Sequence, residues 1–310
     1  MRDASVMSLE ISLFNSFFSS PLFLASGIHG STISSLRRIY NSGAALVVSK
    51  SIGTSTNEGY SLPIITGSDH YLINSVGLSN PGIEQFVHEA LSTTIDFPFV
   101  GSIFAKDEIG FSTLAQKMES IAATGVELNI SCPHAKKGLG ISISSDLDLV
   151  GRIVKKTVDT VSIPVCVKIP PILDKKYLHD LVGTIDKLGA KAIVATNTAV
   201  GMAIDIYRGS PILSNISGGV SGPALKPIAL SVVFDIKKEF DIPVIGVGGI
   251  TTGCEVIEFM QAGASAVQIG SALYYRGYDV FNKIKEELHI LLDDLGCSSI
   301  KDVIGRAQKN

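Results

Sequence analysis

Two lysines and one cysteine in this sequence carry reactive groups within or directly after apolar runs. Lys50 ends the run GAALVVSK, Lys168 interrupts PVCVKI, and Cys132 follows GVELNIS. Two ammonium groups facing one cavity would be unfavourable unless an anion lay between them. The polar neighbours of Cys132 favour access and thiolate formation. This combination predicts an anionic ligand beside a reactive thiol.

The same residues also have a less specific interpretation. A lysine that ends an apolar strand is often a snorkelling side chain or one partner of an ion pair. A lone cysteine is more often a small buried hydrophobic residue than a catalyst. Cys166, between Val165 and Val167, is predicted to be such a core residue. The functional interpretation therefore depends on how many polar residues the fold brings to one place.

Glycine-containing turns provide a second signal. Gly248 and Gly249 follow the run PVIGV, and Gly270 and Ser271 end the run GASAVQIGS. These could be ordinary tight turns. If they follow the last two strands of a barrel, however, they expose backbone N–H groups where many barrels bind phosphate. The turns therefore predict a phosphate-bearing ligand.

Eight short apolar runs alternate with helical patterns and would position these residues. Four begin at a proline, which is tolerated at the start of a strand, and four at a glycine, which suits the residue after a helix. They are nearly continuous in apolarity, as strands buried on both faces are. In chain order the runs begin at Pro21, Gly43, Pro98, Gly125, Pro164, Gly189, Pro243 and Gly263.

This alternation predicts a (β/α)8 barrel of the TIM type in one domain over residues 1–310. A doubly wound open sheet is less favoured because no GxGxxG follows the first strand. The stretch from Lys50 to Pro98 is long for one βα unit and predicts an insertion over the barrel mouth. Asn80 and Asp174 are expected to cap two of the helices. ISLFNSFFSS predicts two short extended segments at the N-terminus.

Composition excludes several classes of function. The chain has 310 residues, a net charge of −3 and four cysteines, with a pI of about 6.1. A general nucleic-acid binder would usually be basic. No CxxC pair is present, so the chain alone is not expected to bind zinc or an iron–sulfur cluster, and no resident metal is predicted. Without a signal peptide or an unbroken apolar run of ~20 residues, a cytoplasmic location is expected.

Longer motifs resemble the dihydroorotate dehydrogenase family. They occur in that family's order and cover the chain from about Ser8 to Leu291. The motifs are LASG (Leu24–Gly27), NSVGLSNPG (Asn74–Gly82), ELNISCP (Glu127–Pro133), NTAVGMAID (Asn197–Asp205), SGGVSGPALKPIAL (Ser217–Leu230), GVGGI (Gly246–Ile250) and GASAVQIGSA (Gly263–Ala272). GMAID and SGGVSGPALKPIAL look most like the form that works with a second subunit carrying FAD and an iron–sulfur cluster.

The resemblance implies FMN-dependent oxidation of (S)-dihydroorotate to orotate in pyrimidine (UMP) biosynthesis. Cys132 would take the C5 proton while the C6 hydride passes to flavin N5. The residues implied for FMN are Ser26, Lys50, Ser51, Ser102, Asn129, Lys168, Thr196, Gly222, Gly248, Gly249, Gly270 and Ser271. Those implied for the substrate are Lys50, Asn74, Gly77, Leu78, Asn129, Asn197 and Thr198. A homodimer core is also implied, and the electron acceptor stays open between NAD through the partner, fumarate and others.

Two positions depart from the family pattern. His134 and Ser102 stand where the family usually has asparagine. The flavin domain of dihydropyrimidine dehydrogenase, a relative, is similar to this chain at both positions. An FMN oxidoreductase acting on uracil-type substrates is therefore the alternative, and a flavin-free phosphate-binding barrel is a third hypothesis.

Overall fold

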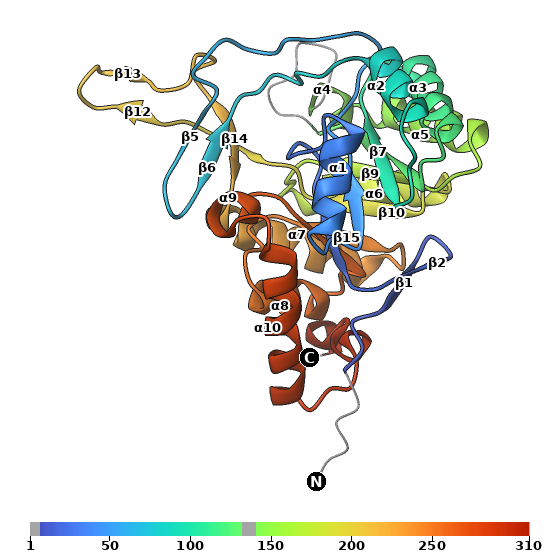
Figure 1. Cartoon of the computed structure of the whole chain (residues 1–310), viewed down its shortest axis with the longest axis vertical. Coiled ribbons are helices and arrows are strands. Elements are labelled where there is room, and N and C mark those ends of the chain that lie inside the picture. Colours follow the sequence, from blue (N-terminus) through green and yellow to red (C-terminus); the bar gives the residue numbers. More distant parts are fainter. Residues whose placement is uncertain (1–6, 132–140, 310) are drawn as a thin grey trace.

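The structure is a computed structural model, and it describes residues 7–131 and 141–309. Eight parallel strands close into a barrel, and they follow one another around it in chain order (Figure 1). The last strand pairs with the first and closes the ring. The barrel strands are β3 (Leu22–Leu24), β4 (Leu46–Val48), β7 (Phe99–Ile103), β8 (Gly125–Asn129), β9 (Val165–Ile169), β10 (Ala192–Ala195), β15 (Val244–Val247) and β16 (Ala266–Ile269).

Each barrel strand falls within one of the eight apolar runs, so the barrel prediction is confirmed. Every residue of these strands is buried. The reason is that one face of each strand packs inside the barrel and the other packs under a helix. Short runs of three to five residues suffice because a barrel has no exposed edge to protect.

One main helix follows each barrel strand and packs on the outside (Figure 1). These helices are α1 (Ile33–Asn41), α2 (Ile83–Leu91), α3 (Glu108–Ser120), α5 (Leu147–Thr160), α6 (Lys175–Lys187), α7 (Lys226–Glu239), α8 (Gly253–Gln261) and α10 (Val280–Asp294). Shorter helices are α4 (Ile141–Ser144), α9 (Ala272–Arg276), η1 (Pro223–Leu225), η2 (Ile300–Val303) and η3 (Arg306–Lys309). In the part of the chain that the structure describes, no helix is both long and apolar enough to cross a bilayer.

The two predicted helix caps have different outcomes. Asp174 caps α6, since its side chain accepts a hydrogen bond from the backbone N–H of Tyr177 at 2.9 Å. The prediction for Asn80 is wrong, because α2 begins later and has Gly82 at its N-cap. The Asn80 side chain instead accepts from the N–H groups of Gly53 and Gly82, at 3.1 and 2.9 Å. Asn80 therefore ties the loop after β4 to the entrance of α2.

The insertion after β4 is confirmed and forms part of a second sheet. Its strands β5 (Ile65–Gly67) and β6 (Leu72–Asn74) pair with β14 (Gly218–Ser221) and β11 (Ala199–Gly201), which follow β10. The order is β11-β14-β6-β5 and the neighbouring strands are antiparallel. Residues from this sheet border the cavity at the barrel mouth, so two insertions far apart in sequence build one wall over the strand ends.

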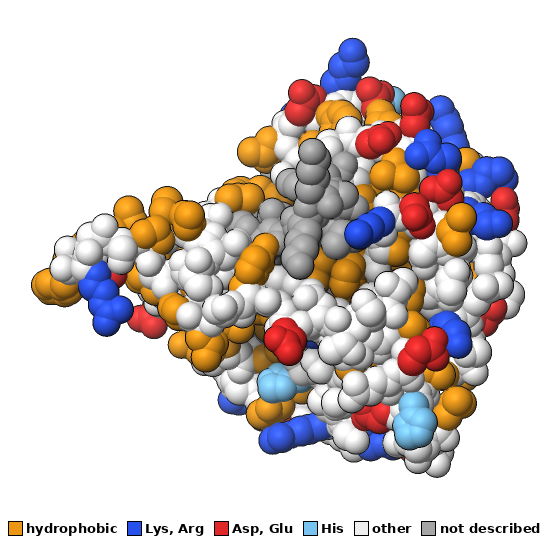
Figure 2. Space-filling model, turned by 90° about the horizontal axis from the view of Figure 1, so that it is seen from above, with side chains coloured by type: hydrophobic (Ala, Val, Ile, Leu, Met, Phe, Trp, Pro, Cys, Tyr) orange, Lys and Arg blue, Asp and Glu red, His pale blue; other side chains and the backbone are white. Residues whose placement is uncertain are grey.

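Two hairpins lie outside this framework. β1 (Ile11–Leu13) and β2 (Ser16–Phe18) are the two short extended segments predicted at the N-terminus, and they pair with each other. β12 (Ile204–Asp205) and β13 (Ser210–Pro211) form an arm that projects from the barrel (Figure 1). Tyr207 on this arm is 95% exposed, and Figure 2 shows hydrophobic side chains gathered along it. Exposed apolar patches of this kind are typical of surfaces that contact another protein.

Candidate active site

A cavity of about 280 Å³ lies at the carboxyl ends of the barrel strands, under the second sheet. Because parallel strands bring their carboxyl ends to one edge, polar residues that end separate runs meet there. The cavity brings together most of the residues predicted for the site. They are Ser26, Lys50, Ser51, Asn74, Gly77, Leu78, Asn129, Lys168, Thr196, Asn197, Thr198, Gly248, Gly249, Gly270 and Ser271.

Four of the residues named from the sequence are not among the described residues that line the cavity. Cys132 lies outside the described residues, and so does His134. Ser102 is fully buried and its hydroxyl lies 2.9 Å from that of Ser51, so it reaches the cavity through Ser51 rather than directly. Gly222 is not among the described residues that line the cavity, although its neighbour Ser221 is.

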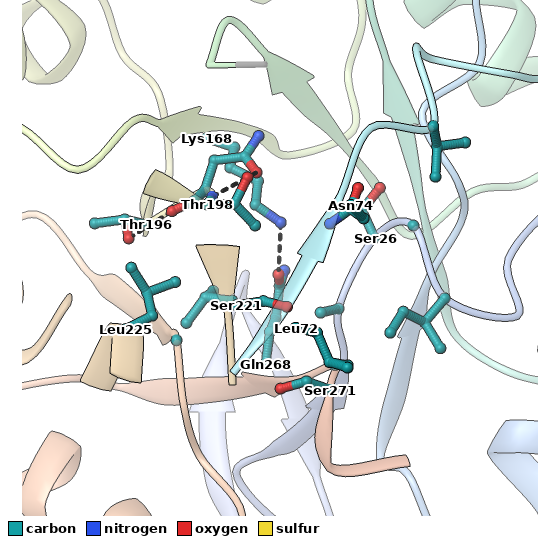
Figure 3. Close-up of a pocket in the computed structure, with 18 of the residues that line it drawn as sticks. Ser26, Leu72, Asn74, Lys168, Thr196, Thr198, Ser221, Leu225, Gln268 and Ser271 are labelled. Carbon is teal, nitrogen blue, oxygen red and sulfur yellow. Dashed lines mark hydrogen bonds between the residues drawn. The ribbon is translucent and has the colours of Figure 1, made fainter. Parts of the chain in front are cut away.

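Lys168 is buried at the base of the cavity and is only 5% exposed. Its Nζ lies 3.4 Å from Oε1 of Gln268 and 3.8 Å from Oε1 of Glu127 (Figure 3 shows the contact with Gln268). A buried ammonium group is tolerated when it is paired and hydrogen-bonded. Glu127 supplies part of the negative charge that balances Lys168. The expectation that only a bound anion would balance the two lysines is therefore corrected.

A group of neutral side chains forms the wall beside β8 and β10. Asn129 Nδ2 donates to Ser51 Oγ at 2.9 Å, and Asn129 Oδ1 accepts from Ser131 Oγ at 2.9 Å. Asn197 Nδ2 in turn donates to Ser131 Oγ at 2.9 Å. Amides of this kind can satisfy both the donors and the acceptors of a polar heterocycle. The mutual hydrogen bonds hold them in place before a ligand arrives.

Glycine turns after β15 and β16 form the adjoining wall. Gly249 is buried and has φ +69°, in the left-handed region. A Cβ on Gly249 would lie 2.8 Å from the carbonyl oxygen of Gly222 and 2.8 Å from the backbone nitrogen of Lys226. Two backbone segments therefore approach as closely as glycine alone permits. This packing places the turn after β15 against the residues that flank η1, at the location where barrels commonly bind phosphate.

Gly77 and Leu78 present a strained turn to the cavity. Their φ angles are +72° and +57°, and the left-handed conformation is unfavourable for leucine. Asn57 holds the turn, because its Nδ2 donates to the carbonyls of Gly77 and Leu78 at 2.8 and 3.1 Å. Residues kept in such conformations by their surroundings cluster at ligand sites.

The sequence interpretation missed Glu127 and Gln268. Both are buried, at 1% and 2% exposed, although they lie in runs that were interpreted as apolar strands. A signal for each was present: side chains two residues apart in a strand share a face. Glu127 precedes Asn129 by two residues, and Gln268 precedes Gly270 by two. The inward face of each strand therefore carries one more polar side chain, of which Gln268 borders the cavity and Glu127 does not.

Cys166 is a core residue, as predicted, and is 2% exposed. Burial raises the pKa of its thiol well above the ordinary value, and the negative charge of Glu127 raises it further. Cys254 is exposed. Treatment of the native chain with iodoacetamide near neutral pH is expected to alkylate Cys254 at least about ten-fold faster than Cys166, since the thiolate is the reactive form. Peptide mass spectrometry measures both rates, and equal rates would contradict the buried position of Cys166.

Comparison with known proteins agrees with this geometry. Residues 8–292 match the sequence profile of the family described as "Dihydroorotate dehydrogenase". A relative from Pyrococcus furiosus, named "Dihydroorotate dehydrogenase B (NAD(+)), catalytic subunit", is 45% identical over 98% of this chain and 100% of its own length. A relative of the same name from Methanocaldococcus jannaschii is 42% identical over 94% of this chain and 95% of its own length.

A solved structure shows the same fold. It is the dihydroorotate dehydrogenase of Eimeria tenella in complex with ferulenol, with a TM-score of 0.86 at 21% sequence identity. The match covers 99% of this chain and 91% of the other. At this level of identity the likeness establishes the fold alone.

Proposed function

The chain belongs to the dihydroorotate dehydrogenase family, and on that premise we propose that its cavity oxidises (S)-dihydroorotate to orotate with FMN as cofactor. The reaction is a step of pyrimidine (UMP) biosynthesis, and we place it in the cytoplasm and in one domain over residues 1–310. The observation that carries the proposal is the convergence of the family's motif residues on one cavity at the strand ends.

The residues present fit FMN on the observations of this structure. Gly249 packs so closely against Gly222 and Lys226 that a Cβ would clash with both, and such turns offer backbone N–H groups to a phosphate. Gly248, Gly270 and Ser271 border the same cavity. We propose that these residues hold the phosphate of FMN through backbone amides.

The remaining residues predicted to contact FMN are assigned roles from the chemistry of their side chains. Lys168 places a positive charge at the base of the cavity, where it favours added negative charge on the cofactor. Ser26, Ser51, Asn129 and Thr196 would hold the flavin by hydrogen bonds, and FMN supplies the acceptor for a hydride. Ser102 would act through Ser51.

The substrate would lie against the amide wall. The ammonium group of Lys50 would bind the carboxylate of dihydroorotate through a charge-assisted hydrogen bond. Asn74 and Asn197 pair with the ring amides, which need both donors and acceptors. Gly77, Leu78 and Thr198 close the site on the side of the second sheet and β10.

Cys132 is the proposed base. Oxidation removes a proton from C5 and a hydride from C6, so a base must reach C5 while the acceptor lies near C6. Cys132 is next to Ser131, which is fully buried and hydrogen-bonded to Asn129 and Asn197. The chain is therefore anchored immediately before Cys132 by side chains of the amide wall.

Electrons must leave the cofactor after each turnover. The relatives named above are catalytic subunits of an NAD(+)-dependent enzyme. We propose that this chain likewise works with an electron-transfer subunit carrying FAD and an iron–sulfur cluster, around a homodimer core. The motifs GMAID and SGGVSGPALKPIAL support this form.

The alternative, oxidation or reduction of uracil-type rings, depends on Ser102 and His134. Ser102 lies behind Ser51, and His134 lies outside the described residues. Lys50 at the cavity favours a substrate that carries a carboxylate, which dihydroorotate has and dihydrouracil lacks.

Anaerobic visible spectra of the purified chain test the function. The chain is expected to show flavin absorbance that bleaches when dihydroorotate is added, because the hydride then resides on the cofactor. Dihydrouracil at the same concentration is the control and is expected to leave the absorbance unchanged. Bleaching by dihydrouracil alone would favour the alternative substrate class, and a chain that binds no FMN would contradict the cofactor assignment.

A further inference from the structure

Glu127 is a buried carboxylate that does not itself line the cavity and that the reaction above does not use. It is 1% exposed, on β8, inside the barrel. Gln268 Nε2 donates to its Oε2 at 2.9 Å, and Ser102 Oγ donates to its Oε1 at 3.2 Å. The Nζ of Lys168 lies 3.8 Å from the same Oε1. A charge this deep is tolerated only with such a full set of partners.

The hydrogen bonds fix the direction of the carboxylate. A carboxylate only accepts, so the Ser102 hydroxyl must donate to Glu127. The Ser51 hydroxyl must then donate to Ser102, since the two oxygens are 2.9 Å apart. Ser51 in turn accepts from Asn129 Nδ2 at 2.9 Å. Both oxygens of Glu127 are therefore held: Oε1 by Ser102 on the neighbouring strand β7, and Oε2 by Gln268 on β16, which is not adjacent to β8.

Gln268 connects the carboxylate to the ammonium group. Its amide nitrogen donates to Glu127 and its amide oxygen accepts from Lys168 Nζ at 3.4 Å. Each end of the amide thus has a partner of the correct kind, which leaves one orientation for the Gln268 side chain. Lys168 accordingly has a hydrogen bond to Gln268, which borders the cavity, and an ion pair with Glu127, which does not border it (Figure 3 shows the first).

We propose that Glu127 is a positioning residue for the reaction, which holds the Lys168 ammonium group against the bound cofactor through Gln268 and through its own charge. This inference rests on the proposed function, because it assumes that FMN occupies the cavity beside Lys168. It also gives Ser102 a role: a serine hydroxyl donates to Glu127 where the family usually has asparagine.

The test is a double-mutant cycle on FMN binding, measured by quenching of flavin fluorescence. Glu127→Gln keeps the shape and removes the charge, and it is expected to raise the Kd for FMN by about ten-fold, the typical effect of losing a hydrogen-bonded charge. In a Lys168→Met background the same change is expected to alter the Kd by less than about two-fold, because coupled residues are not additive. Glu127→Asp, which restores the charge, is expected to recover part of the affinity.

Two further variants sharpen the result. Glu84→Gln is the matched control, since Glu84 forms an exposed ion pair with Lys117 at 3.4 Å on the barrel exterior, and it is expected to leave the Kd unchanged. Gln268→Leu removes the bridging amide and is expected to weaken FMN binding in the same direction, which serves as the test if Glu127→Gln does not fold by circular dichroism.

The outcomes separate the two proposals. A wild-type chain that binds no FMN overturns the proposed function and the inference with it. A wild-type chain that binds FMN, with an unchanged Kd in folded Glu127→Gln or in Gln268→Leu, overturns the inference alone. The inference is also overturned if Glu127→Gln raises the Kd for FMN equally in the wild-type and Lys168→Met backgrounds, because Glu127 would then act on the cofactor without Lys168.

Discussion

Replacing Cys132 by serine is expected to slow the reduction of bound FMN by dihydroorotate by about two to three orders of magnitude at neutral pH. A hydroxyl is a far weaker base than a thiol, because the thiolate is accessible near neutral pH and the alkoxide is not. The rate in the variant is expected to rise as pH increases, as a larger fraction of the hydroxyl loses its proton. Anaerobic stopped-flow absorbance measures this rate in a single turnover.

Cys254→Ser is the matched control for this experiment. Cys254 is an exposed cysteine on α8, on the outside of the barrel, so the same chemical change there is expected to leave flavin reduction unaffected. The FMN content of both variants is expected to equal that of the wild type, since neither residue is assigned to cofactor binding. An unchanged reduction rate in Cys132→Ser would remove Cys132 from the role of base.

The barrel itself was accessible from the sequence because each strand is a short apolar run with its own start signal. Pro21 and Gly43, for example, precede β3 and β4, and the runs recur at a spacing that leaves room for one helix between them. Once the barrel is assumed, its carboxyl ends gather whichever polar residues end the runs. Lys50, Lys168 and Asn197 could therefore be assigned to one cavity without any knowledge of pairing.

Two features could not be predicted from the sequence. One is how far a polar side chain lies from the cavity, and the other is which strands distant in sequence pair with each other. Ser102 and Lys168 are both polar residues within barrel strands, but Ser102 lies behind Ser51 whereas Lys168 borders the cavity. That difference depends on how the strands are staggered around the barrel, and one sequence does not determine the stagger. Similarly, the antiparallel pairing of β6 with β14 joins Asn74 to Gly219, and no local signal in either segment identifies its partner.

A local rule for helix starts fails at Asn80, although the same rule holds at Asp174. An asparagine followed by a proline and a helical pattern is a typical N-terminal signal. In the structure the Asn80 carboxamide is instead used to join Gly53 and Gly82, two backbone segments that the insertion after β4 brings together. The Asn80 side chain therefore makes a tertiary contact, whereas the local rule predicts that it caps the helix.

Replacing Gly249 by alanine is expected to raise the Kd for FMN by about ten- to hundred-fold, the range that one to a few kcal/mol of backbone strain produces. Two effects act together at this position. The backbone has φ +69°, which alanine adopts unfavourably. The new methyl group would also lie 2.8 Å from Gly222 O and from Lys226 N, so the residues that flank η1 on both sides must move away from the turn and widen the proposed phosphate cradle.

Gly209→Ala separates these two effects. Gly209 has a similar φ of +61°, but it is exposed on the β12–β13 arm and a Cβ there would meet no atom within 4 Å. The Gly209→Ala variant is expected to have a slightly lower free energy of unfolding, because alanine adopts a positive φ unfavourably, and to bind FMN with an unchanged Kd. If both variants lost FMN to the same extent, general destabilisation would explain the loss. If only Gly249→Ala loses FMN while its melting temperature in the absence of cofactor stays close to that of Gly209→Ala, the loss follows from the close approach of the two backbone segments, which ties the glycine turn directly to the phosphate.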